Sequence, residues 1–122
     1  MDLFNIIREL EACADAARAL DMSRYMKNKF PFFGIQAPIR DEICKPYFKD
    51  AKKEKKIDWD FVEYCWQHEK RECQYVAAYY LKSMQKFLEF TDFEKLKKLV
   101  IKKSWWDTVD TLDRVIGSIV YQ

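Results

Sequence analysis

Near the C-terminal end of the chain, two adjacent tryptophans are followed by an aspartate in the sequence KKSWWDTVDTLDR, residues 102–114. Trp106 and Asp110 are four positions apart, so on a helix their side chains project from the same face. A carboxylate attracts positive charge, and so does the electron-rich face of an indole ring. An indole and a carboxylate held side by side could therefore stabilise a cation that develops during a reaction.

The same residues also have ordinary structural explanations. Ser104 and Asp107 fit the capping box of a helix that begins here, because their side chains can bond to free backbone N–H groups. Trp105 falls on the stripe that is expected to face the core. Asp110 can form a surface ion pair with Arg114 at i+4, worth about 0.3–0.5 kcal/mol. Spacing alone favours this ion pair over a catalytic role for Asp110.

The composition is that of a folded, helical protein. Apolar residues make up 49% of the 122 residues and aromatic residues 16%, which argues against disorder. Two glycines and three prolines leave few turns, so long helices are expected. No stretch approaches the ~18 uncharged apolar residues of a transmembrane helix, and no signal peptide opens the chain. We therefore expect no association with a membrane.

The charges and the cysteines restrict the function further. The net charge is only +2, so any affinity for nucleic acid must come from a local patch. The four cysteines form no CxxC pair and, without a secretory signal, indicate reduced thiols in a cytoplasmic protein. Cys65, His68 and Cys73 could be read as part of a zinc site, but a fourth ligand is lacking and both cysteines fit buried helical stripes. We expect no metal and no cofactor.

Helical periodicity runs through almost the whole chain. Residues 3–10 form the first predicted helix and residues 15–28 the second, which should stop before Pro31. Gly34 should supply the bend that follows. The inner side of the second helix is predicted to comprise Ala16, Ala19, Leu20, Met22 and Met26.

Further helices are predicted from capping signals and apolar stripes. The third helix begins near Pro38, and Pro46 should kink it or split it. Asp58 should cap the next helix, and Thr91 should open a later one through a capping box with Glu94. The residues expected to be buried by the two helices between these caps are Phe61, Val62, Cys65, Trp66, Cys73, Val76, Ala77, Tyr80, Leu81 and Met84.

The pattern gives about seven helices and no convincing strand. Because the connections are short, neighbouring helices should pack as antiparallel pairs, and such pairs in series predict an α-solenoid with HEAT-like repeats. The repeats share little identity, so a compact bundle remains an alternative on pattern alone. The chain ends in the apolar run RVIGSIVYQ without a polar capping turn. Either it self-associates through that end or, as we favour, residues 1–122 are one domain at the N-terminal part of a longer protein.

Three stretches together resemble a known family: SRYMKNKFPFFGIQAPIRDEI, RECQYVAAYYL and KKSWWDTVDTLDR. They are similar, in register over essentially all 122 residues, to the bacterial DNA alkylation repair family of AlkD-like DNA glycosylases. The resemblance implies a HEAT-like α-solenoid about twice this length, whose partner is double-stranded DNA. It implies an enzyme that excises positively charged N3- and N7-alkylated purines from a basic concave groove, without necessarily flipping the lesion into a pocket.

The resemblance also assigns roles to individual residues. The catalytic aspartate of the family corresponds to Asp110, and a tryptophan of its catalytic cleft to Trp106. A cleft tyrosine near the N-terminus corresponds to Tyr25. The family also uses an arginine and a second tryptophan from later helices, which lie beyond these 122 residues. In this chemistry the cationic base leaves without a strong acid, and the carboxylate and the rings stabilise the oxocarbenium-like sugar.

Cations near the same surface are the candidates for contacts to DNA phosphates, which would make binding fall steeply with salt. They are Lys27, Lys29, Arg40, Lys102, Lys103 and Arg114. The run KDAKKEKK, residues 49–56, mixes both signs and is better explained as a solvated helix end.

Other functions remain open at this point. A non-catalytic HEAT-like module that binds DNA or protein has the same helical pattern. Tyr75, Tyr79 and Trp66 could stack bases as in single-strand binders, but their helical spacing favours packing. For the glycosylase, the resemblance implies a location in the bacterial cytoplasm, at the nucleoid when bound to DNA.

Overall fold

The computed structural model describes residues 1–102, 111–112 and 114–117, whose regular secondary structure is helical, with no strand. Residues 111–112 and 114–117 form the last helical segment. The expectation of an all-helical chain with about seven helices is confirmed. Short 3-10 turns occupy the connections at Lys52–Glu54, Gln85–Phe87 and Phe90–Asp92. The α-helices are α1 (Asn5–Ala12), α2 (Ala16–Tyr25), α3 (Ala37–Ala51), α4 (Trp59–Gln67), α5 (Arg71–Ser83) and α6 (Phe93–Ile101).

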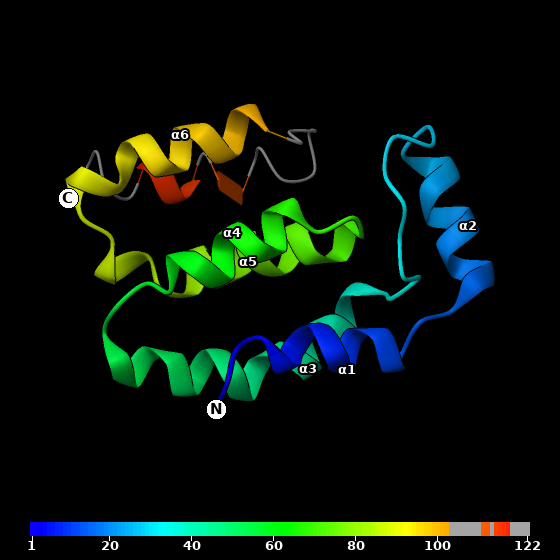
Figure 1. The fold of residues 1–122 in the computed structure, drawn as a ribbon, viewed down its shortest axis with the longest axis horizontal. Coiled ribbons are helices and arrows are strands. Elements are labelled where there is room, and N and C mark those ends of the chain that lie inside the picture. The colour runs from blue at the N-terminus through cyan, green and yellow to red at the C-terminus, as the bar shows by residue number, and fades with distance from the viewer. Residues whose placement is uncertain (103–110, 113, 118–122) are drawn as a thin grey trace.

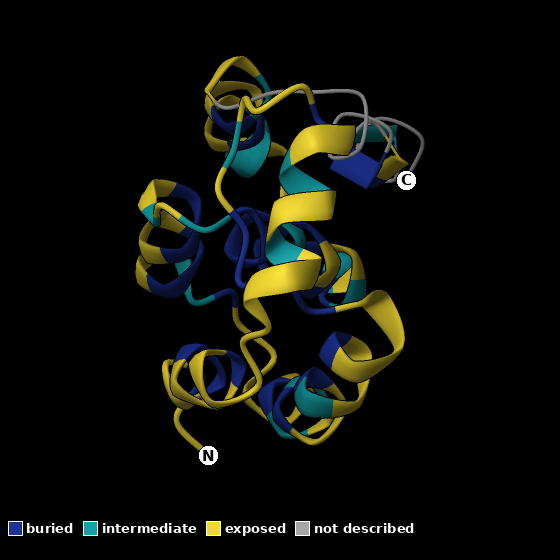
Figure 2. Ribbon diagram, turned by 90° about the vertical axis from the view of Figure 1, so that its right-hand side faces the viewer, coloured by how far each residue is buried: buried dark blue, intermediate teal, exposed yellow. Residues whose placement is uncertain are grey.

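The helices form two layers that run along the long axis of the molecule (Figures 1 and 2). One layer contains α1, α4 and α6, and the other contains α3, α5 and the last helical segment. The helices α1 and α3 pack together, as do α4 and α5, and α3 also packs against α5. This stacking of antiparallel pairs is the predicted HEAT-like α-solenoid, in which each pair buries its apolar face against the next.

The core lies between the two layers, where the buried faces of the helices meet (Figure 2). All ten residues predicted to be buried in α4, α5 and the residue that follows α5 are buried. Asp58 caps α4 as predicted, because its Oδ1 accepts a hydrogen bond of 3.0 Å from the backbone N–H of Phe61. Each fully buried large apolar side chain contributes about 1.5–3 kcal/mol to stability.

The ends and breaks of two helices differ from the sequence predictions. The helix α3 continues through Pro46 to Ala51, so of the two predicted outcomes, a kink or a split, the split does not occur. Pro46 and Glu42, whose carbonyl loses its usual donor, both lie on the exposed side of α3, where water can replace the missing bond. The predicted capping box of Thr91 and Glu94 is absent, and α6 begins at Phe93. Instead, Glu89 and Asp92 form a reciprocal capping box one turn earlier.

The second helix is shorter and more exposed than predicted. It ends at Tyr25, because Lys27 and Asn28 adopt left-handed conformations with φ of 57° and 58°. None of its residues is fully buried. Of the predicted inner side, Ala16 and Leu20 are exposed, whereas Ala19 and Met22 are half-buried, so the prediction is only partly confirmed. The physical reason is its position, since α2 stands across one end of the two layers instead of joining either (Figure 1). Only Met26, just beyond its end, is buried.

The bend predicted at Gly34 is confirmed, because Gly34 has a φ of +94°. Its Cα also lies against the start of α2. A Cβ at this position would overlap the carbonyl oxygen of Asp15 and lie 2.7 Å from the backbone nitrogen of Ala19. Both the backbone conformation and the lack of space therefore require glycine.

We expect Gly34→Ala to lower the free energy of unfolding by at least about 2 kcal/mol, since it adds strain and a steric overlap with backbone. Gly117→Ala is the matched control, because Gly117 is helical and a Cβ added there would meet open space, with no atom within 4 Å. This control should be neutral or stabilising by up to about 1 kcal/mol. Urea denaturation followed by circular dichroism measures both, and equal stability of the two variants would contradict the packing described for Gly34.

Candidate functional site

Tyr25 and two of the predicted phosphate-binding lysines lie together at one tip of the molecule. Tyr25 is the last residue of α2 and is 74% exposed. Lys27 and Lys29 follow it within the turn and are exposed. The hydroxyl of Ser23 donates a hydrogen bond of 3.1 Å to the carbonyl of Phe30, which closes this turn. The tip therefore presents one aromatic ring and two cations to the solvent.

Three predicted site residues, Lys103, Trp106 and Asp110, lie outside the described residues, but both flanks of this stretch are described. The indole N–H of Trp66 donates a hydrogen bond of 2.8 Å to the carbonyl of Lys102. On the other flank, Leu112 and Val115 are buried in the core. The chain is thus anchored immediately before residue 103 and again after residue 110. Lys102 and Arg114 are exposed, as a contact to phosphate requires.

Arg40 does not fit the role that was predicted for it. It is only 7% exposed, so little of its side chain is open to a DNA phosphate, which counts against the predicted contact. Its guanidinium lies 5.0 Å from the ring centre of Tyr75 and 5.5 Å from that of Tyr79. Its Nε also lies 3.8 Å from Oδ1 of Asp41. A guanidinium is weakly hydrated and packs well on aromatic faces, which explains why this cation is buried.

A shallow hollow of about 470 Å³ between α3 and α5 supplies cations that sequence reasoning missed. Lys45 and Lys52 from α3 and its C-terminal cap, and Lys82 from α5, line it together with the carboxylate of Asp41. Tyr79, which is 41% exposed, forms part of its wall. Lys52 belongs to the run of residues 49–56 that the sequence analysis assigned to a solvated helix end. Its i, i+7 spacing from Lys45 is the signal that could have revealed this face.

Aromatic rings and cationic side chains alternate in a row that runs from the turn after Tyr25 to this hollow. The guanidinium of Arg71 lies 3.9 Å from the ring centre of Phe30 and 5.6 Å from that of Tyr75. Tyr75 also contacts Arg40, as described above. The ammonium of Lys82 lies 5.9 Å from the ring centre of Tyr79. The members of this row, in spatial order, are Phe30, Arg71, Tyr75, Arg40, Tyr79 and Lys82.

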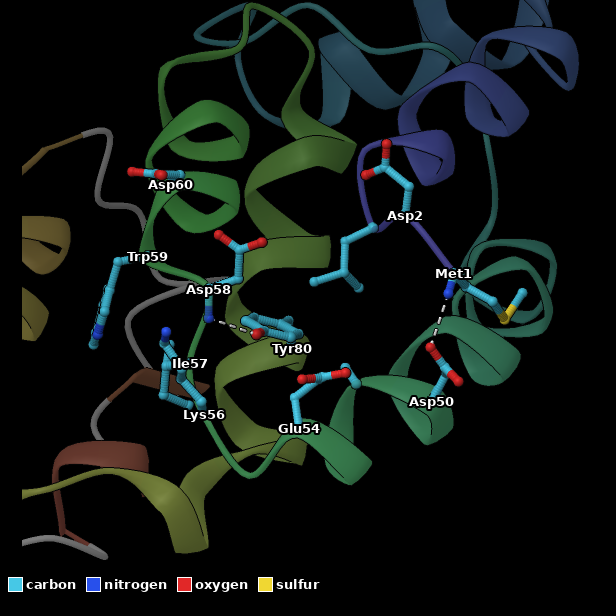
Figure 3. A pocket seen from close by; sticks show the side chains of 12 residues that line it. Met1, Asp2, Asp50, Glu54, Lys56, Ile57, Asp58, Trp59, Asp60 and Tyr80 are labelled. Atoms are coloured by element: carbon cyan, nitrogen blue, oxygen red, sulfur yellow. Dashed lines mark hydrogen bonds and ion pairs between the residues drawn. The ribbon is translucent and has the colours of Figure 1, made fainter.

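A second cavity, of about 610 Å³, lies near the N-terminus, and five of the twelve residues that line it are carboxylates (Figure 3). The N-terminal ammonium lies 3.0 Å from Oδ2 of Asp50, and its hydrogen bond and its charge lower the pKa of that carboxyl. The hydroxyl of Tyr80 accepts a hydrogen bond of 2.9 Å from the backbone N–H of Asp58 (Figure 3). Burial raises the pKa of this phenol. The acidic lining repels phosphate, so this cavity is a poor candidate for binding DNA.

Three of the four thiols are buried, whereas that of Cys13 is exposed. Cys65 and Cys73 are buried in the core, and the Nδ1 of His68 accepts a hydrogen bond from the N–H of Lys70. Burial raises the pKa of Cys44 to about 12 and that of Cys65 well above its ordinary value, which disfavours thiolate chemistry. Within the described ranges, no group of three or more His, Cys, Asp or Glu side chains could hold a metal ion.

Among the residues that the structure describes, no helix is both long enough and apolar enough to cross a membrane.

The fold and the surface together define a HEAT-like α-solenoid with a cationic hollow on one layer and an exposed aromatic tip. The family model for the DNA alkylation repair enzyme matches residues 6–122, and the chain belongs to this family. The resemblance to the DNA alkylation repair family found in the sequence is thereby confirmed.

One solved structure similar to this chain is a "Predicted DNA alkylation repair enzyme from Enterococcus faecalis". It is 31% identical and superimposes with a TM-score of 0.78. The match covers 88% of this chain and 51% of that one, so the chain spans about half the length of the relative. A comparison with curated proteins finds no match.

The position of Arg40 predicts an effect on stability. Arg40→Ala removes a buried cation that packs on two rings, so it should lower the free energy of unfolding by about 1–2 kcal/mol. Lys45→Ala, on the exposed side of the same helix, should change it by less than about 0.5 kcal/mol. Urea denaturation of both variants measures the difference. An Arg40→Ala protein as stable as the wild type would contradict the packing role of this arginine.

Proposed function

We propose that the protein is a DNA glycosylase that excises positively charged N3- and N7-alkylated purines, and that this chain forms its N-terminal half. The observation that carries the proposal is family membership over residues 6–122 in a chain that contains the sequence WWDTVD. The helical fold and the cationic hollow support it, since a solenoid of this kind offers an extended surface to a duplex. The site would be completed by an arginine and a tryptophan from later helices.

The proposed reaction depends on Asp110. An alkylated purine with a positive charge is already a good leaving group, so its departure needs no strong acid. The difficult species is the oxocarbenium-like sugar that remains. A carboxylate close to its C1′ atom stabilises the developing charge and orients the attacking water. A neutral base leaves too slowly without an acid, which accounts for a preference for cationic lesions.

Trp106 and Tyr25 are proposed to surround the same sugar. The faces of their rings attract the positive charge, and their bulk excludes water, which strengthens the electrostatic interaction with the carboxylate. The exposure of Tyr25 at the tip of α2 supports this role, because the ring is accessible to a ligand. Side chains alone perform these steps, so the proposed mechanism includes no cofactor or metal.

Two groups of cations are proposed to grip the duplex through its phosphates. The first comprises the predicted residues Lys27, Lys29, Lys102, Lys103 and Arg114. The second comprises Lys45, Lys52 and Lys82 of the hollow, which replace Arg40. The hollow and Arg114 belong to the same layer of helices, which supports a continuous cationic surface (Figure 2). For a bacterial enzyme that acts on DNA, we propose a location in the cytoplasm, at the nucleoid when bound.

Asp110→Asn should abolish catalysis while leaving binding intact. We expect the release of 7-methylguanine from methylated DNA by the full-length protein to fall at least about 100-fold, since the amide cannot neutralise the sugar cation. Affinity for the DNA should change by less than about threefold, because Asp110 makes no phosphate contact in this mechanism.

Asp107→Asn is the matched control, because the Oδ1 of asparagine can still accept the capping-box hydrogen bond and Asp107 has no assigned part in the reaction. Equal release of the base by the wild type and by Asp110→Asn would remove Asp110 from the mechanism. DNA binding that falls with salt, without any base release by the wild type, would instead favour the alternative of a non-catalytic DNA-binding module. Absence of DNA affinity would favour a protein-binding solenoid.

The cationic hollow predicts the salt dependence of binding. In the Lys45→Gln/Lys82→Gln double variant, the slope of log K against log salt should decrease by about 1.8, or about 0.9 for each lost phosphate contact. Fluorescence anisotropy with a duplex at several salt concentrations measures this slope. The control is Lys97→Gln/Lys98→Gln, because these exposed lysines lie on α6, in the other layer. Equal slopes for both double variants would exclude the hollow as a phosphate site.

A further inference from the structure

We propose that Glu72 is a positioning residue for Tyr25, because its buried carboxylate fixes the loop that holds α2 in place. The inference rests on the proposed function, in which Tyr25 packs against the reacting sugar. Glu72 lies in the first turn of α5 and is 0% exposed. It is therefore beyond the reach of DNA, and any effect it has on the reaction must pass through other residues.

The carboxylate of Glu72 accepts three hydrogen bonds from consecutive backbone N–H groups. Its Oε1 lies 2.8 Å from the nitrogen of Phe33, and its Oε2 lies 2.9 Å from that of Gly34 and 3.1 Å from that of Ile35. A buried carboxylate is tolerated only when such bonds replace its water, and bonds to a charged acceptor are stronger than neutral ones. Both oxygens are used, so the loop cannot shift without leaving a charge unsatisfied.

The loop in turn holds the start of α2. The carbonyl of Phe33 accepts a hydrogen bond of 2.9 Å from the N–H of Asp15, which is the N-cap of α2. Gly34 lies in close contact with Asp15 and Ala19. The helix has no fully buried residue of its own, and Met26 just beyond its end is the nearest one. Its backbone contacts with the loop therefore contribute much of what holds it in place.

The neighbouring residue of α5 holds the other part of the same loop. The N–H of Arg71 donates a hydrogen bond of 2.8 Å to the carbonyl of Pro31, and its guanidinium packs on Phe30. Phe30 is tied through its carbonyl to Ser23, close to the end of α2. Both ends of α2 are thus linked to the first turn of α5. Tyr25, the exposed last residue of α2, is held in place through these links.

Hydrogen exchange in the 122-residue chain tests the mechanical part of the inference. In Glu72→Gln, an NH₂ group replaces one acceptor and faces the N–H groups of the loop. The peptide covering residues 15–25 should exchange at least about tenfold faster, while the peptide covering residues 76–84 in the core should be unchanged. Glu69→Gln, an identical change at an exposed position, is the control. Wild-type exchange of residues 15–25 in a folded Glu72→Gln protein would overturn the inference.

Base release by the full-length protein tests the link to Tyr25. Glu72→Gln should reduce the release of 7-methylguanine about 10–100-fold at saturating DNA, because the ring is misplaced. The loss of DNA affinity should be smaller, because Lys27 and Lys29 move with the ring but the lysines of the hollow do not. In a Tyr25→Ala background the same change should have no further effect. Losses that add in the double variant would show that Glu72 does not act through Tyr25. No base release by the wild type would count against the proposed function, whereas the exchange experiment would still decide the role of Glu72.

Glu72→Asp is a milder second variant, for the case in which Glu72→Gln does not fold. It keeps the charge but is shorter by one methylene, so it can satisfy only part of the three N–H groups. We expect exchange and base release between those of the wild type and Glu72→Gln. Complete unfolding of both variants would show that Glu72 supports the core as a whole, and the inference would then be wrong.

Discussion

The structure depends most on the burial of α5 between α3 and α4. Nine of its thirteen residues are buried, and they include Arg71, Glu72 and Gln74 in its first turns. A polar group that loses its water must be satisfied by the protein, or it costs roughly 1–3 kcal/mol. The positions of these three side chains are therefore strongly constrained, and so are the positions of the segments that they bind.

Gln74 and Glu72 each connect α5 to another segment of the chain. The side-chain nitrogen of Gln74 donates to the carbonyls of Cys65 and His68, at 2.9 and 2.8 Å, and so satisfies groups left open at the end of α4. Glu72 binds the loop of residues 33–35 in the same way but with the opposite polarity, because a carboxylate accepts where an amide donates. The N-terminal end of α5 thus binds both α4 and the loop that holds α2, the helix that ends at Tyr25.

The sequence predicted those parts of the fold that follow from local periodicity. The buried stripes of α4 and α5, the cap at Asp58 and the bend at Gly34 each depend on residues close together in the chain, and all are confirmed. The environments of α2 and Arg40 depend on distant segments. An amphipathic pattern cannot show that no layer covers α2. Charge alone cannot show that Arg40 lies under two tyrosines.

The candidate site was predictable only in part for the same reason. Lys45 and Lys82 are 37 positions apart and meet only because α3 packs against α5. Their proposed role raises an electrostatic question, since cations near a forming sugar cation would oppose it. In the proposed complex the DNA phosphates neutralise these lysines, whereas Arg40 and Arg71 remain stacked on rings. At an effective dielectric of about 20, a carboxylate 4 Å from the sugar contributes about 4 kcal/mol, so the nearest charge dominates. The lysines can therefore bind the duplex without opposing the positive charge on the sugar.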